Sequence, residues 1–151
     1  MSYSFPRIAL YDTTTQNIVT IGVPQVITFN TLDNTSKIIH TSSSRFTIIE
    51  PGRYSIVGKA QINLLSGSNK FIDIWIRKTG LDIPISVGRW GIPTVNNDIS
   101  VPILGYTDCN INDYLEVWVT GDSTSLQIAT VAPINGAPIV HSVDLVIIKT
   151  G

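Results

Sequence analysis

Two segments of alternating apolar and polar residues flank a short turn in this chain, and they constrain its fold more than any other feature. Residues 45–48 read Arg-Phe-Thr-Ile and residues 54–57 read Tyr-Ser-Ile-Val, with Pro51-Gly52 in the turn between them. Such alternation is typical of strands that bury one face. Proline presets φ at the first central position of a tight turn and glycine supplies a positive φ at the second, which favours a type II turn. The pattern predicts a β-hairpin inside a sandwich.

Strand signals continue along the chain, and no window sustains the 3.6-residue apolar period of an amphipathic helix. The clearest inward faces are formed by Tyr54, Ile56, Ala60, Ile62 and Leu64, by Ile72, Ile74 and Ile76, and by Leu115, Val117 and Val119. Strand signals spaced about 8 to 12 residues apart predict an all-β, two-sheet antiparallel sandwich of about ten strands. We expect residues 31–36, which are mostly polar, to form a loop.

Composition favours a protein that associates with itself. Of the 151 residues, 14% are charged, and the formal net charge is −1, so copies of the chain repel each other weakly. The ten Lys and Arg residues are scattered, which argues against nucleic acid as a partner, because binding to phosphates needs clustered cations. No segment reaches the ~20 apolar residues of a membrane span, and no signal peptide is recognisable. We therefore expect synthesis in a cytoplasm and no membrane association.

Residues that carry chemistry in enzymes are few here and far apart. His40 and His141 are the only histidines, and the single Cys109 excludes an internal disulfide. No Gly-x-Ser-x-Gly nucleophile elbow occurs. Residues 96–98 and 110–113 offer oxygen ligands for calcium, although turn-forming Asn and Asp explain both segments equally well. We expect no catalytic residue, no metal site and no cofactor.

The order of several motifs resembles one family. The segment from Phe46 through Pro51 and Gly52 to Tyr54 is similar to the G-x-F-x-x-x-x-P-G-x-Y segment that opens the central strand in the tumour necrosis factor and complement globular-head superfamily. The leading glycine of that motif is absent here. Residues 72–80 follow in the expected order, and residues 111–119 resemble a later strand of the family, with Asn112-Asp113 in place of Gly-Asp.

The resemblance covers residues 25–150 and implies a ten-stranded jelly roll that forms a compact homotrimer around an axis lined by one sheet. Members act as binding or structural modules without catalysis. We expect residues 18–151 to form the jelly roll and residues 1–17 to form an N-terminal arm. Bulky side chains opposite the core faces are candidates for the trimer interface, namely Val57, Tyr114, Trp118, Val146 and Ile148. The alternative is that these side chains are singly exposed without function.

Three functions follow as hypotheses. The first is a virion structural protein, a trimer that decorates or cements a phage or virus capsid, with the major capsid protein as partner. Its arm would dock to the shell through Tyr3, Phe5, Ile8 and Leu10. The second is a receptor- or glycan-binding head of a viral fibre or of a cell or spore surface. The third is an enzyme, for which the sequence shows no converging polar groups.

The glycan hypothesis has its own candidate residues. Trp75 and Trp90 could stack on the apolar face of a sugar, and the loops around Trp90 and Asn135-Gly136 would supply hydrogen bonds to its hydroxyls. Both tryptophans are explained equally well as core or interface residues.

Overall fold

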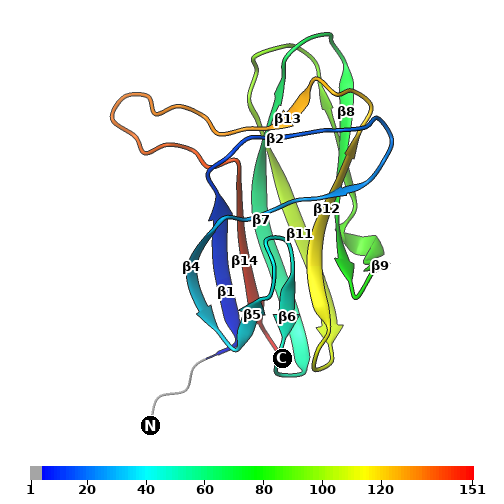
Figure 1. Ribbon diagram of the computed structural model, residues 1–151, viewed down its shortest axis with the longest axis vertical. Coiled ribbons are helices and arrows are strands. Elements are labelled where there is room, and N and C mark those ends of the chain that lie inside the picture. The colour runs from blue at the N-terminus through cyan, green and yellow to red at the C-terminus, as the bar shows by residue number, and fades with distance from the viewer. Residues whose placement is uncertain (1–4) are drawn as a thin grey trace.

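The computed structural model describes residues 5–151 and arranges them in two antiparallel β-sheets packed face to face (Figure 1). The elements of this part of the chain are β1 (Arg7–Asp12), β2 (Gln16–Asn17), β3 (Gln25–Val26), β4 (Thr31–Ser36), β5 (Ile38–His40), β6 (Phe46–Ile48), β7 (Gly52–Leu64), β8 (Lys70–Lys78), β9 (Leu81–Asp82), the 3-10 turn η1 (Pro84–Ser86), β10 (Gly88–Ile92), β11 (Ile99–Cys109), β12 (Tyr114–Gly121), β13 (Leu126–Ile128) and β14 (Val143–Lys149). The predicted all-β, two-sheet fold is confirmed. There are more strands than the expected ten or so because β2, β3 and β9 contain two residues each.

The long strand β7 organises the first sheet. It pairs with β11 along one edge, and with β14 and then β13 along the other. Beyond β14 come β1 and β4, which gives the order β4-β1-β14-β7-β11, with β2 joined to β13. The second sheet has the order β10-β8-β12-β6-β5, with β9 on β8 and β3 on β12. The chain passes repeatedly between the two sheets, as in a jelly roll.

The core lies between the sheets, where the predicted inward faces meet. The alternating residues of β7, β8 and β12 named above are all buried, with exposed fractions of at most 1%. Phe29 and Phe46 pack edge to face at the end near β6, with ring centroids 5.4 Å apart. Alternation therefore identified correctly which side of these three strands faces the core.

The predicted hairpin at Pro51-Gly52 is wrong, because the two flanking strands belong to different sheets. β6 pairs with β5 and β12, whereas β7 pairs with β11, β13 and β14. Gly52 has a φ of 154°, far from the value of about 80° in a type II turn. A Cβ on Gly52 would lie 2.5 Å from the carbonyl oxygen of Gly151, so close approach of the backbone requires glycine here. The segment is a crossover between the sheets.

Tyr54 stabilises this crossover from the core side. Its ring is fully buried, and its hydroxyl donates a hydrogen bond of 2.6 Å to the carbonyl oxygen of Glu50. The family-like motif of Phe46, Pro51, Gly52 and Tyr54 thus has a local structural role. The buried residues Phe46 and Tyr54 precede and follow the crossover segment, and the Tyr54 hydroxyl binds its backbone.

The expected N-terminal arm is wrong for residues 7–12, because they form β1 inside the first sheet. β1 pairs with β14 on one side and with β4 on the other (Figure 1). Ile8 and Leu10 are core residues, with exposed fractions of 0% and 2%. Phe5 precedes the strand and is 70% exposed, while Tyr3 lies outside the described residues. The jelly roll therefore begins at Arg7 and not at residue 18.

Residues 31–36 form the edge strand β4 and not the expected loop. Their polar sequence hides the strand because four of the six residues are exposed and none is buried. Polar side chains on an edge strand limit its pairing with other molecules, and such a strand lacks the alternation that sequence analysis relies on.

Candidate functional site

The outer face of the first sheet carries a row of apolar side chains that crosses four strands. In the register, Ala9 of β1 is opposite Val146 of β14. Val57 of β7 lies between Val146 on one side and Leu104 of β11 on the other. Directly opposite residues share one face of a sheet. We call these four residues the apolar row; Val57 and Leu104 within it are 55% and 56% exposed.

Exposed side chains two residues further along β14 and β11 enlarge this surface. Ile148 of β14 and Tyr106 of β11 lie on either side of Ser55, and they are 41% and 46% exposed. Ile85 of η1, together with Leu104 and Tyr106, lines a shallow hollow of about 290 Å³. Contiguous apolar surface of this kind commonly marks a contact with another macromolecule.

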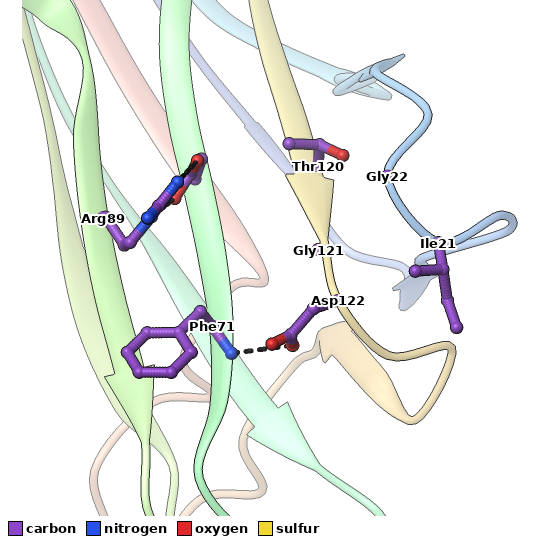
Figure 2. A pocket seen from close by; sticks show the side chains of 8 residues that line it. Ile21, Gly22, Phe71, Arg89, Thr120, Gly121 and Asp122 are labelled. Carbon is purple, nitrogen blue, oxygen red and sulfur yellow. Dashed lines mark hydrogen bonds and ion pairs between the residues drawn. The ribbon is translucent and has the colours of Figure 1, made fainter.

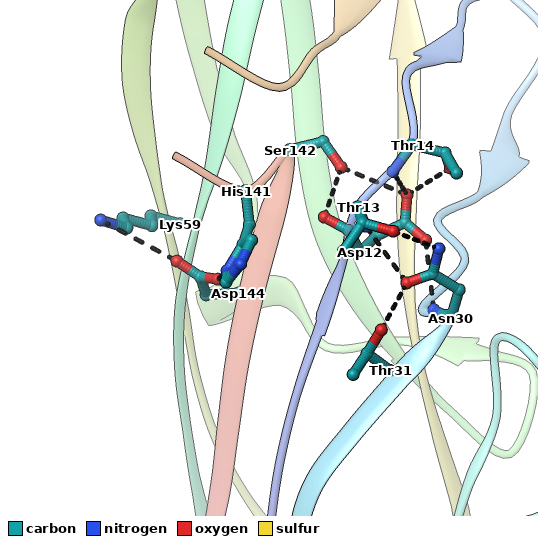
Figure 3. Close-up of polar contacts among 9 residues, drawn as sticks. All are labelled: Asp12, Thr13, Thr14, Asn30, Thr31, Lys59, His141, Ser142 and Asp144. Atoms are coloured by element: carbon teal, nitrogen blue, oxygen red, sulfur yellow. Dashed lines mark hydrogen bonds and ion pairs between the residues drawn. The ribbon is translucent and has the colours of Figure 1, made fainter. Parts of the chain in front are cut away.

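Charged groups border the apolar surface at both ends. At one end Asp144 lies 3.9 Å from the Lys59 ammonium group and 3.0 Å from Nδ1 of His141 (Figure 3). The His141 ring also stacks on Tyr11, with 3.9 Å between centroids. At the other end Arg53 donates to Asp108 at 2.9 Å. An apolar centre with a polar rim is the composition of protein interfaces.

The five residues predicted for the trimer interface lie on two different sheets. Val57, Val146 and Ile148 are neighbours on the first sheet, within the surface just described. Tyr114 and Trp118 lie on β12, in the second sheet. Sequence analysis missed Ala9, Leu104 and Tyr106, although the alternation along residues 99–109 was a usable signal for the last two.

Both aromatic residues on β12 already have partners within their own chain. The Arg45 guanidinium lies 3.9 Å from the centre of the Tyr114 ring, and the Arg77 guanidinium lies 4.1 Å from that of Trp118. Trp118 is also the register partner of Trp75 on β8. Cation–π contacts of this kind stabilise the sheet itself, so these two side chains need no second copy to cover them.

The stacking surface hypothesised from Trp75 and Trp90 is not formed. Trp75 is 8% exposed, and its indole Nε1 donates to Asp82 at 2.8 Å. Trp90 is partly buried and packs against the core. Trp90 is opposite the buried Ile72 in the register, whereas Trp75 lies on the other face of the sheet, so the two rings do not form one surface.

Among residues 5–151, no group of three or more His, Cys, Asp and Glu side chains is placed to hold a metal ion. The Asp113 carboxylate in the proposed calcium segment accepts hydrogen bonds from the Asn110 amide at 2.7 Å and from Thr79 Oγ1 at 2.9 Å. Asp113 therefore fits the turn-forming explanation. In the same part of the chain, no helix has the length and apolarity to cross a membrane.

Asp12, at the end of β1, is a buried carboxylate that joins three separate segments (Figure 3). Its Oδ2 accepts from the Thr14 amide at 3.1 Å, from Thr14 Oγ1 at 2.6 Å, from Gln16 Nε2 at 3.2 Å and from Ser142 Oγ at 3.2 Å. Its Oδ1 accepts from the Asn30 amide at 3.1 Å. These contacts explain why a carboxyl group is tolerated at 1% exposure, because both of its oxygens accept hydrogen bonds.

Replacement of this carboxylate tests its structural role. We expect Asp12→Asn to lower the free energy of unfolding by about 2–4 kcal/mol, because the amide nitrogen of Asn cannot accept the hydrogen bonds of Thr14 and Ser142. The measurement is urea denaturation followed by circular dichroism. Asp33→Asn, at an exposed position of β4, is the matched control and should leave stability unchanged. Equal stability of both variants would contradict this role.

Cys109 is a buried thiol rather than a reactive one. It is 3% exposed, and burial raises the pKa of its thiol from 9.0 to about 11. The neutral thiol is therefore favoured in the folded state, and the stability it contributes is complete below about pH 9 and is lost as the pH rises through about 11. We expect negligible reaction with a thiol-specific disulfide reagent at about pH 8, and full reaction in denaturant. Rapid labelling of the folded protein would contradict this.

No protein-family model matches this chain, and no curated protein matches it in sequence.

Proposed function

We propose that this chain is a non-enzymatic structural protein that functions as a homotrimer and decorates or cements a virion shell, with the major capsid protein as its partner. The observation that carries the proposal is the apolar row of Ala9, Val57, Leu104 and Val146 across the outer face of the first sheet. The trimeric state comes from the family resemblance, which implies an axis lined by one sheet.

A second copy of the same chain is the occupant that best fits this face. The rim pairs Lys59 with Asp144 and Arg53 with Asp108, so both signs of charge are present on one surface and it can complement a copy of itself. The low net charge of −1 opposes association only weakly. Burial of Val57, Leu104 and Ile148 contributes about 25 cal/mol for each Å² of apolar area removed from water.

The proposed contact with the shell cannot use two of the four residues that were expected to dock to it. Ile8 and Leu10 lie in the core and are not available to dock to a neighbouring protein. If the first sheet lines the trimer axis, the second sheet and the loops at either end are the surfaces left to meet a capsid. Attachment then depends on the trimer presenting three such surfaces together, which raises avidity.

The experiment that tests the proposal is the solution mass, measured by light scattering after size exclusion at two well-separated concentrations. A stable mass near three times 16.5 kDa supports the trimer. Trimer should then co-sediment with empty shells of the virus that carries the gene, and shells mixed with an unrelated protein of similar mass are the control. A monomer at both concentrations overturns the proposal.

A further inference from the structure

A hollow of about 290 Å³ lies on the second sheet, away from the apolar row. It is formed where β8, β10 and β12 meet the loop before β3 (Figure 2). Its lining includes Phe71, Asp73, Arg89, Thr120, Asp122 and Ile21. None of these residues belongs to the crossover at Pro51-Gly52, to the apolar surface of the first sheet or to the Asp12 hydrogen bonds described above. We propose that this hollow binds one pyranose ring of a neutral glycan.

An exposed aromatic ring forms one wall. Phe71 is 47% exposed, and a Cβ on Gly91 of the adjacent strand would approach the ring to 3.2 Å. The missing side chain at Gly91 therefore leaves room for the ring to lie against β10. Ile21, 58% exposed, is the other large apolar side chain of the lining. An apolar lining with a few well-placed polar groups is typical of small-ligand sites.

The polar groups are fixed and mostly accept hydrogen bonds. Arg89 donates to both oxygens of Asp73, from Nε at 2.7 Å and from Nη2 at 2.9 Å, which holds both side chains in one plane. Asp122 Oδ1 accepts from the Phe71 amide at 2.8 Å, and its carboxylate stays exposed with acceptor capacity to spare. Carboxylates at these positions suit the hydroxyl groups of a sugar.

Thr120 of β12 lines the hollow, but not through its hydroxyl oxygen. Thr120 Oγ1 is buried and has no hydrogen bond to any group in residues 5–151. The accessible area of this oxygen is below 1 Å², so neighbouring protein atoms cover it and it is not presented to a ligand in the hollow. The loop that closes the hollow is also anchored, because the Gly22 amide donates to the carbonyl oxygen of Gly121 at 3.0 Å. The site is therefore formed before any ligand arrives.

The charged groups that line the hollow favour neutral sugars over anionic ones. The hollow contains one guanidinium, from Arg89, and two carboxylates, from Asp73 and Asp122. Arg89 is already neutralised by a bidentate pair, so the surplus charge is negative and disfavours sialic acids, sulfated sugars and phosphates. The volume lies just below the range of about 300–1,000 Å³ for drug-sized ligands, which suits a single ring.

Nuclear magnetic resonance of the isotope-labelled full chain tests this site. The probes are the methyl glycosides of galactose, glucose, mannose and N-acetylglucosamine, with N-acetylneuraminic acid as the anionic comparison. We expect at least one neutral glycoside to shift the amide signals of Phe71, Thr120 and Gly22 with a Kd on the order of 1 mM, and the anionic sugar to leave them unchanged.

Two variants separate the site from non-specific binding. Phe71→Ala and Asp73→Asn should each weaken binding at least about tenfold. Asp82→Asn, which breaks the comparable exposed ion pair with Arg77, should bind like the unmodified protein. The proposal is overturned if no neutral glycoside shifts these three amides, if N-acetylneuraminic acid binds equally well, or if Phe71→Ala binds unchanged.

Discussion

Val57→Asp should convert the proposed trimer to a monomer, with the mass in light scattering falling to 16.5 kDa. Val57 occupies the middle of the apolar row, between Val146 and Leu104, and in the proposed trimer each subunit contributes one copy. A carboxylate enclosed there without a partner costs several kcal/mol per subunit. The fold itself should persist, because Val57 is 55% exposed within one chain. Circular dichroism spectra should therefore match those of the unmodified protein.

Val19→Asp is the matched control for this experiment. Val19 is 75% exposed and lies outside the first-sheet surface, so the same change of side chain should leave the mass unchanged. A Val57→Asp protein that keeps the trimeric mass would remove the outer face of the first sheet from the interface. If both variants lost the trimeric mass, the added negative charge itself, and not its position, would explain the loss of assembly.

Removal of residues 1–12 should abolish the folded state rather than merely detach the protein from a shell. The deletion takes away Ile8 and Leu10 from the core, each worth about 2–5 kcal/mol, and both backbone pairings of β1. It also removes Asp12 and leaves its buried donors unpaired. The summed loss is comparable to the whole stability of a domain, about 5–15 kcal/mol. We expect no cooperative thermal transition by circular dichroism.

Removal of residues 1–5 provides the control for that deletion. It leaves β1 complete and retains Pro6, whose carbonyl oxygen accepts a hydrogen bond from the Lys149 amide at 3.0 Å. This shorter deletion should melt cooperatively near the temperature of the full chain. If the longer deletion also melted cooperatively, β1 would be dispensable, and the hypothesis of a docking arm would regain its support.

Local pattern was a reliable guide where a strand buries one face. The alternation at Ile72, Ile74 and Ile76 predicted their burial, because a period of two places every second side chain on the same side. The same reasoning failed for β4, whose residues are exposed on both faces. It also failed for the sequence around Pro51-Gly52, since a turn motif shows that the chain bends but not which sheet it enters.

The candidate sites were predicted less completely than the fold. Val57, Val146 and Ile148 were identified because they oppose inward faces, yet the position of Val57 beside Leu104 depends on the pairing of strands more than forty residues apart. The hollow at Phe71 could not be foreseen, because it needs β8, β10, β12 and the loop at Gly22 to converge. The tryptophans that seemed suited to sugar binding are instead packed within the chain.

Sequence alone determined that this chain is an antiparallel β protein, which sides of its main strands face the core, and that its charge is low. These properties arise from neighbours along the chain and from composition, both of which can be read directly. Only the tertiary structure decided that Ile8 and Leu10 belong to the core, that residues 49–51 cross between sheets, and that Ala9, Val146, Val57 and Leu104 form one row. Those features depend on register between distant strands, which packing of the whole core selects.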